Sequence, residues 1–152
     1  MAPLASDLRR ELDRSIGTAR TLAEAGARAA IDRLGVESDV APGGQPPEQR
    51  ALRLQLRARL RAVGKQGLVE EIAYEQWHRM LFARFLAETD LLFHPEGAPV
   101  SLAEVKELAD EEGERDMWVL AARYAAAMLP GIFRADDPAN RVAFAPEDRS
   151  RL

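Results

Sequence analysis

Four arginines recur along one segment with a spacing that would gather their side chains on a single face of a helix. They fall within an arc of about 80° when successive residues are set about 100° apart, and they are Arg50, Arg53, Arg57 and Arg61. Leucines and one valine fill the adjoining arc. Guanidinium groups donate paired N–H groups to phosphate oxygens. This face therefore predicts sequence-independent contacts to the backbone of double-stranded DNA.

The same amphipathic basic pattern has other interpretations. Its charges are also typical of a solvated helix face, or of a helix that pairs with an acidic partner helix. A basic amphipathic helix would also suit a membrane surface. The residues of this segment leave these alternatives open.

A second pattern of charges lies in the most aromatic stretch of the chain, Val69 to Leu92. Arg84 and Glu88 stand four residues apart and project into an arc otherwise occupied by apolar side chains. A charged pair in such an arc is costly unless its members satisfy each other. We expect Arg84 and Glu88 to form a structural ion pair that fixes how neighbouring helices dock.

Other polar residues lack the spacing that catalysis or metal binding requires. His78 and His94 are the two histidines, and neither lies in a zinc motif or beside a triad partner. The acidic run at 110–114 has only the composition of a metal site. Gln45-Pro-Pro-Glu48 lacks the Asn or Asp and the aromatic ring of the motif with which amino-methyltransferases grip a base. We therefore expect no catalytic residue and no metal ligand in this chain.

Helical periodicity accounts for nearly all of the remaining sequence. Apolar residues at three- and four-residue spacing, together with capping and breaking residues, predict helices at about 7–34, 47–64, 67–91, 102–112 and 115–129. Alternating strand patterns of useful length are absent. The predicted fold class is all-α, an irregular bundle of about five helices around a buried central helix at about 67–91, with no sheet.

Local signals place the ends of several helices. Ser6 is the expected cap of the first helix, and Gly17 and Gly26 lie within it, which favours a kink or break near Gly26. Ser101 and Glu104 have the spacing of a capping box. Pro146 stands at the first position of a short helical turn close to Leu152, which suggests a further helix that the chain does not finish.

These signals predict a division of the chain into three parts. Residues 1–35 form an N-terminal helix, residues 36–47 form a flexible linker rich in Pro and Gly, and residues 48–152 form a helical domain that is truncated at the start of a further helix.

The amino-acid composition limits the cellular compartments and the partners that suit this chain. Its 152 residues contain no cysteine, so an oxidising compartment is not required. No apolar run is long enough for a membrane span or a signal peptide, and we expect a cytoplasmic protein without a membrane partner. Residues 1–66 carry 12 Lys or Arg against 8 Asp or Glu, whereas residues 67–152 carry 9 against 17. A basic half and an acidic half suit either nucleic-acid binding or helices that pair with each other.

Three stretches together resemble a known family. Leu54 to Gly64 (LQLRARLRAVG), Val69 to Glu88 (VEEIAYEQWHRMLFARFLAE) and Met128 to Phe133 (MLPGIF) are similar to the N-terminal helical region of adenine-specific DNA methyltransferases. These enzymes belong to restriction-modification and BREX-type phage-exclusion systems. The likeness covers about residues 50–150, and Trp77-His78-Arg79 stands where Phe-Asn-Arg is common.

The resemblance implies a parent enzyme that transfers a methyl group from S-adenosylmethionine to adenine N6 in DNA. No cofactor-binding or base-flipping motif of the family falls in this chain, so the cofactor is implied for the full-length parent alone. The chain would then be an accessory region that contacts DNA or acts as a scaffold. Its partners would be double-stranded DNA and the downstream methyltransferase domain or other defence-system subunits. The alternative from the residues themselves is a freestanding α-helical protein-interaction or dimerisation module.

Overall fold

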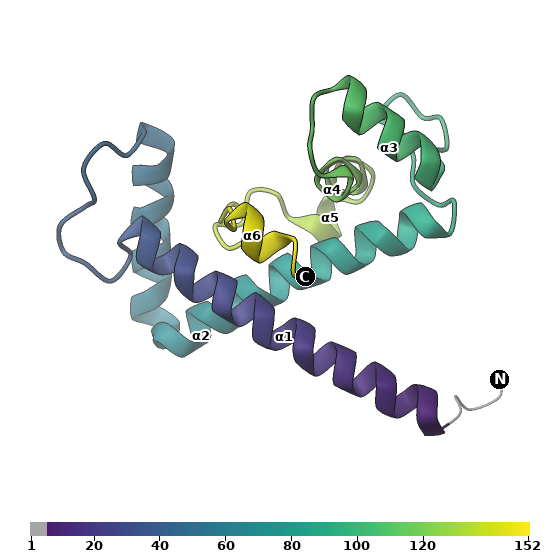
Figure 1. Cartoon of the computed structure of the whole chain (residues 1–152). Helices are drawn as coiled ribbons and strands as arrows, with labels where there is room; N and C mark the ends of the chain where they lie inside the picture. Colours follow the sequence, from purple (N-terminus) through teal and green to yellow (C-terminus); the bar gives the residue numbers. More distant parts are fainter. Residues whose placement is uncertain (1–5) are drawn as a thin grey trace. The chain divides into compact units, whose positions relative to one another are not determined.

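The structure, a computed structural model, describes residues 6–152 of the chain. Regular structure within these residues is helical, which confirms the predicted all-α class; β pairing there is limited to an isolated bridge between Phe93 and Pro99. Figure 1 labels the helices, which are α1 (Ser6–Leu34), α2 (Pro47–Glu88), α3 (Leu102–Glu111), α4 (Met117–Met128), α5 (Pro130–Phe133) and α6 (Pro146–Arg149).

Helix α1 is continuous from its first described residue to the predicted end. Residues 1–5 of the predicted N-terminal segment lie outside the described residues, and Ser6, expected as the cap, is the first helical residue. Gly35 has a φ of 63°, and Val36 N donates to Ile31 O across 3.1 Å. This left-handed closing turn is the Schellman arrangement, which glycine favours because it has no Cβ.

Gly26 does not break α1, because it serves packing instead. A Cβ at this position would lie 2.7 Å from the ring of Phe144, which is buried against the helix. The glycine therefore lets the C-terminal segment approach α1 closely, and α6 also packs against α1. The cost of a glycine within a helix, about 1 kcal/mol relative to Ala, is offset by this contact.

Helix α2 contains the break that Gly64 predicts. Its backbone there has φ 76° and ψ 170°, which is outside the helical region, so residues 47–63 and 65–88 are two helical segments joined at a kink. The Nε of Arg59 lies 2.8 Å from Glu71 Oε2, and this ion pair joins the two segments across the kink. The helix ends at Glu88, three residues before the predicted end, because Asp90 adopts a left-handed conformation with φ 56°.

The shorter helices have clear local causes. Ser101 accepts from the backbone N–H of Glu104, whose side chain accepts from Ser101 N, so the predicted capping box is confirmed for α3. Helix α4 begins two residues later than predicted, because Asp116 caps it by accepting from Trp118 N across 3.0 Å. Pro146 begins the predicted turn at the C-terminal end of the chain, α6.

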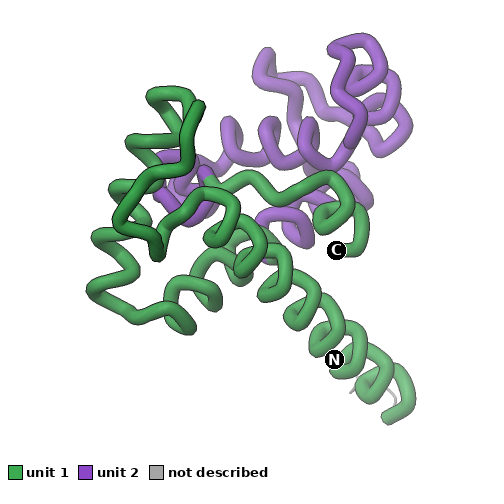
Figure 2. Tube along the Cα trace, turned by 60° about the vertical axis from the view of Figure 1, so that its left-hand side comes forward, with its two compact units in different colours: residues 1–77, 142–152 green, residues 78–141 purple. Residues whose placement is uncertain are grey.

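The chain forms two compact units, shown in different colours in Figure 2. Unit 1 contains residues 1–77 and 142–152, and unit 2 contains residues 78–141. The core of unit 1 consists of apolar residues from α1, from the segment 36–47, from both segments of α2 and from the C-terminal segment: Ala23, Ala27, Ala30, Ile31, Leu34, Val36, Leu52, Leu56, Leu68, Val69, Ile72, Ala73, Val142 and Phe144. The core of unit 2 is built around Leu86, Leu92, Val105, Leu120, Tyr124 and Phe133.

This division differs from the one predicted from composition. The segment 36–47, expected to be a linker, belongs to unit 1, where Val36 is fully buried and Gln45 Nε2 donates to Leu34 O across 3.1 Å. The helix expected to be central supplies buried residues to both units. Its burial holds for one side only, since Tyr74, Leu81 and Phe85 remain 56%, 51% and 49% exposed.

Candidate functional site

Two of the four arginines predicted to contact DNA hold a loop of the chain itself. Arg53 is buried, with its Nε 2.9 Å from Gly35 O, and its Nη2 also donates to Ser38 O. The next arginine, Arg57, donates to Val36 O across 3.3 Å and to Ser38 O, and it pairs with Asp39 at 2.8 Å. These bonds fold the segment 36–47 onto α2.

The other two arginines of this face are more exposed. Arg50 donates from Nη1 to Gln45 O across 2.7 Å, which adds another contact to the same loop. Arg61 is exposed, and no side-chain hydrogen bond or ion pair is found for it in residues 6–152. Arg61 is thus the member of the predicted set whose guanidinium group is most open to a phosphate.

Arg84 and Glu88 form the expected ion pair, but on the surface of unit 2. Their Nε and Oε1 atoms are 2.8 Å apart, and the side chains are 59% and 44% exposed. The guanidinium group also lies 5.3 Å from the ring centre of Trp118 on α4. This cation–π contact joins α2 to α4. Whether the pair fixes how helices dock stays a prediction.

The histidines pack against aromatic rings. The ring of His78 stacks on Phe82 with 5.9 Å between centroids, and His94 meets the ring of Tyr124 edge-on at 5.1 Å. Across residues 6–152, no three His, Cys, Asp or Glu side chains gather in a way that could hold a metal ion. Residues 6–152 form no strand, so the turn between a strand and a helix that grips nucleotide cofactors in doubly wound folds does not occur in them.

A polar cluster at the end of α3 was not predicted from the sequence, although its carboxylate belongs to the acidic run at 110–114. Tyr124 Oη donates to Glu112 Oε1 across 3.0 Å, and Arg123 pairs with the other oxygen of the same carboxylate. The hydrogen bond from Tyr124, followed by that from Arg123, lowers the pKa of Glu112. Burial raises the pKa of Tyr124, and the neighbouring carboxylate adds to this effect. The cluster ties the end of α3 to α4.

A groove of about 260 Å³ in unit 1 was also not predicted. It lies between α1 and α2, with apolar and aromatic walls and charged residues around them; its lining residues are Ile16, Arg20, Ala23, Glu24, Glu70, Ala73, Tyr74 and Trp77. The rings of Tyr74 and Trp77 are 6.5 Å apart and tilted by 48°. Their spacing of three residues was a usable signal, but only the position of α1 makes a groove beside them.

The charges of this groove largely satisfy one another. Arg20 Nε lies 2.9 Å from Glu24 Oε1, and Arg20 Nη2 lies 3.8 Å from Glu70 Oε1. The hydrogen bond from Arg20 lowers the pKa of Glu24. With the charges paired, the groove presents mainly the walls formed by Ile16, Tyr74 and Trp77 to a ligand.

No protein-family model matches the chain, and no curated protein or solved structure is significantly similar to it. Within residues 6–152, none of the helices combines the length and the apolar character needed to cross a membrane.

Proposed function

We propose that this chain is an accessory, non-catalytic region of an adenine-N6 DNA methyltransferase of a restriction-modification or phage-defence system, and that it acts mainly as a scaffold. The single observation that carries the scaffolding role is the groove of unit 1, whose exposed aromatic wall suits the docking of an apolar segment. The resemblance of α2 and of residues 128–133 to methyltransferase N-terminal regions supplies the class of the parent enzyme.

In this role the groove receives part of the downstream methyltransferase domain or another subunit of the same system. S-adenosylmethionine is bound by that domain and not by this chain. Double-stranded DNA is contacted through phosphates, and Arg61 is the leading contact because its guanidinium group is exposed. A base leaves the DNA stack only if the surrounding duplex is held, which is the work of an accessory surface. The setting is the cytoplasm.

The decisive test removes the coding region for residues 6–152 in the native cell and maps N6-methyladenine across the genome by long-read sequencing. We expect loss of methylation at a discrete DNA sequence, with recovery when the intact region is returned. Tyr74→Asp, which places a charge in the groove, should restore little methylation, whereas Leu54→Asp should restore it fully, because Leu54 is exposed on α2 and does not line the groove. An unchanged methylation pattern after deletion rejects the proposal.

The second candidate is a freestanding helical interaction module, and the long exposed part of α1 favours it. This candidate predicts that deletion leaves N6-methyladenine unchanged while an assembly containing the chain is lost.

A further inference from the structure

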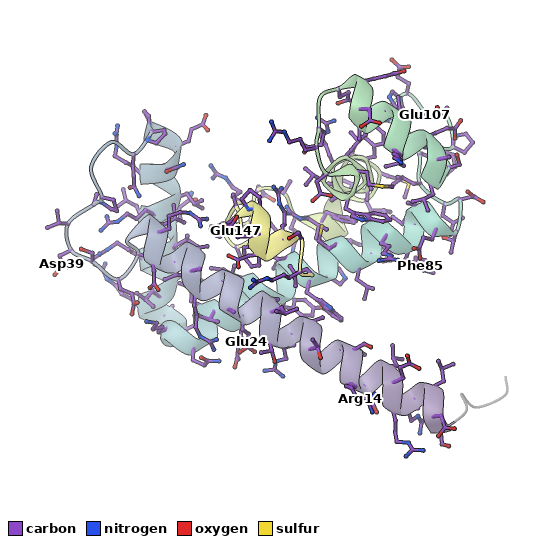
Figure 3. The ribbon with its side chains drawn as sticks, viewed as in Figure 1. Arg14, Glu24, Asp39, Phe85, Glu107 and Glu147 are labelled. Carbon is purple, nitrogen blue, oxygen red and sulfur yellow. The ribbon has the colours of Figure 1, made fainter. Side chains whose placement is uncertain are left out.

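The first half of α1 stands apart from the rest of unit 1. Residues 6–18 are exposed on every side of the helix, and this part extends beyond the other segments of the unit (Figure 2). Side chains point outward all around it, as Figure 3 shows near Arg14. An isolated helix of this length is only marginally stable in water. A second helix packed along it would supply the missing stabilisation.

An apolar stripe runs along this exposed part. Leu8, Leu12 and Ile16 are spaced by four residues and remain 52%, 48% and 42% exposed. On a helix they lie at about 0°, 40° and 80°, which makes one continuous stripe. Large aliphatic side chains at four-residue spacing form a ridge that can pack into the groove of a second helix.

Charged residues flank the stripe on both sides. Arg9 and Asp13 lie at about 100° and 140° on one flank, Glu11 lies at about 300° on the other, and Arg14, at about 240°, lies on the face opposite the stripe. The first flank therefore carries one cation and one anion. No ion pair involves these four side chains in the part of the chain that the structure describes.

This pattern is complementary to itself when two copies run antiparallel about Leu12. In that register Leu12 faces Leu12 of the second copy, and Leu8 faces Ile16. Antiparallel helices bring like flanks together, so Arg9 meets Asp13 of the second copy on one side. Two interchain pairs of opposite charge then border one side of the apolar seam.

A parallel pair would also bury the stripe, but it suits the fold less well. Ala23 and later residues of α1 are packed within unit 1. Parallel helices would bring the bulk of both copies to the same end of the seam, whereas antiparallel helices place them at opposite ends.

We infer that residues 6–18 of α1 are a self-association surface, which pairs antiparallel with the same residues of a second copy of this chain. This inference does not depend on methyltransferase function or on DNA, although Ile16 belongs both to the stripe and to the groove of unit 1.

The first test measures the oligomeric state of the complete chain by sedimentation equilibrium. The wild type should reach twice the mass of one chain in a concentration-dependent manner. Leu12→Asp, which places two facing carboxylates in the seam, should remain monomeric with an unchanged circular dichroism spectrum. Leu54→Asp is the matched control, since Leu54 is an exposed leucine of α2, 64% exposed against 48% for Leu12, and this variant should dimerise normally. A wild type that stays monomeric at high concentration, or a control that also dissociates, overturns the inference.

The second test addresses the antiparallel register. Arg9→Asp and Asp13→Arg should each weaken dimerisation roughly tenfold or more, because attractive pairs become repulsive. An equimolar mixture of the two variants should recover association. In the mixed pair, the carboxylate introduced at position 9 of one chain faces the guanidinium group introduced at position 13 of the other, and the native Asp13 and Arg9 face each other as before. In a parallel pair, residues 9 and 13 of one chain would face the opposite flank of the other chain. The mixed pair would then gain as many attractive contacts as it loses, and it would bind no more tightly than the separate variants. A mixture no tighter than the separate variants overturns the antiparallel pairing.

Discussion

The guanidinium group of Arg53 donates from Nε to the backbone carbonyl of Gly35 across 2.9 Å, and so joins α2 to the turn that closes α1. The same side chain is 5% exposed and also bonds Ser38 O. Backbone carbonyls in a loop need donors when they are shielded from water. The segment 36–47 is ordered because α2 supplies these donors.

We expect Arg53→Ala to lower the free energy of unfolding by about 2–3 kcal/mol, since charge-assisted hydrogen bonds from a buried guanidinium group to loop carbonyls are lost. Urea unfolding followed by circular dichroism measures the change. Arg61→Ala is the matched control on the same helix, and it should change the free energy by less than about 0.5 kcal/mol because the side chain is exposed. Equal effects of the two substitutions would contradict the role given to Arg53.

Two glycines of α1 should respond in opposite directions to the same substitution. Gly17→Ala should stabilise the protein by roughly 0.5–1 kcal/mol, since a Cβ there meets no atom within 4 Å and Ala favours the helix. Gly26→Ala should destabilise it by about 1–3 kcal/mol, because the new methyl group would overlap the ring of Phe144. Thermal unfolding of both variants measures these changes in stability. Stabilisation by Gly26→Ala would show that the ring of Phe144 moves away freely.

Acid should weaken the protein partly through Glu112. Because the folded-state pKa of this carboxyl lies below its unfolded value, its contribution to stability is present above about pH 4.5 and is lost as the pH falls further. Tyr124→Phe removes the leading cause of the lowered pKa and should therefore flatten the dependence of stability on pH in this acidic range. Urea unfolding on both sides of about pH 4.5 measures the slope.

The neighbouring substitution Glu111→Gln is the control for this pH dependence. It should leave the difference between wild type and Tyr124→Phe unchanged. If the stability of Tyr124→Phe depends on acidic pH as strongly as that of the wild type, the hydrogen bond to Glu112 does not cause this pH dependence.

If the chain contacts DNA, Arg61 should contribute to the salt dependence of binding. We expect Arg61→Ala to reduce the slope of log affinity against log salt by about 1, the value for one lost phosphate contact. Fluorescence anisotropy with a short synthetic duplex at several salt concentrations provides the slope. Arg115→Ala, an exposed arginine of unit 2, serves as the control. An unchanged slope for Arg61→Ala removes this residue from the predicted contacts.

Local chemistry accounts for the features of the fold that were predicted. Gly35 and Gly64 stand where the backbone has positive φ, and Ser101 with Glu104 satisfies the exposed N–H groups at the start of α3. Such signals depend on residues within a few positions of each other, so a single sequence carries them. The all-α class follows from the same local periodicity.

The candidate site was less predictable because its residues come together from distant parts of the chain. A helical wheel places Arg53 and Arg57 on one face, but it does not reveal that loop carbonyls 15 to 21 positions earlier lie within reach of them. Likewise, Trp77 and Tyr74 form a groove only because α1 runs beside α2.

By itself, the sequence determined the helical class, the kink at Gly64 and the capping box at Ser101, because each depends on short-range backbone and side-chain preferences. Tertiary structure decided which charges are used internally and which surfaces remain open. It turned Arg53 into a loop clamp, made Gly26 a contact point for Phe144, and left Leu8, Leu12 and Ile16 exposed. The physical reason is that burial and partner choice depend on contacts between residues far apart in sequence, which helical periodicity does not encode.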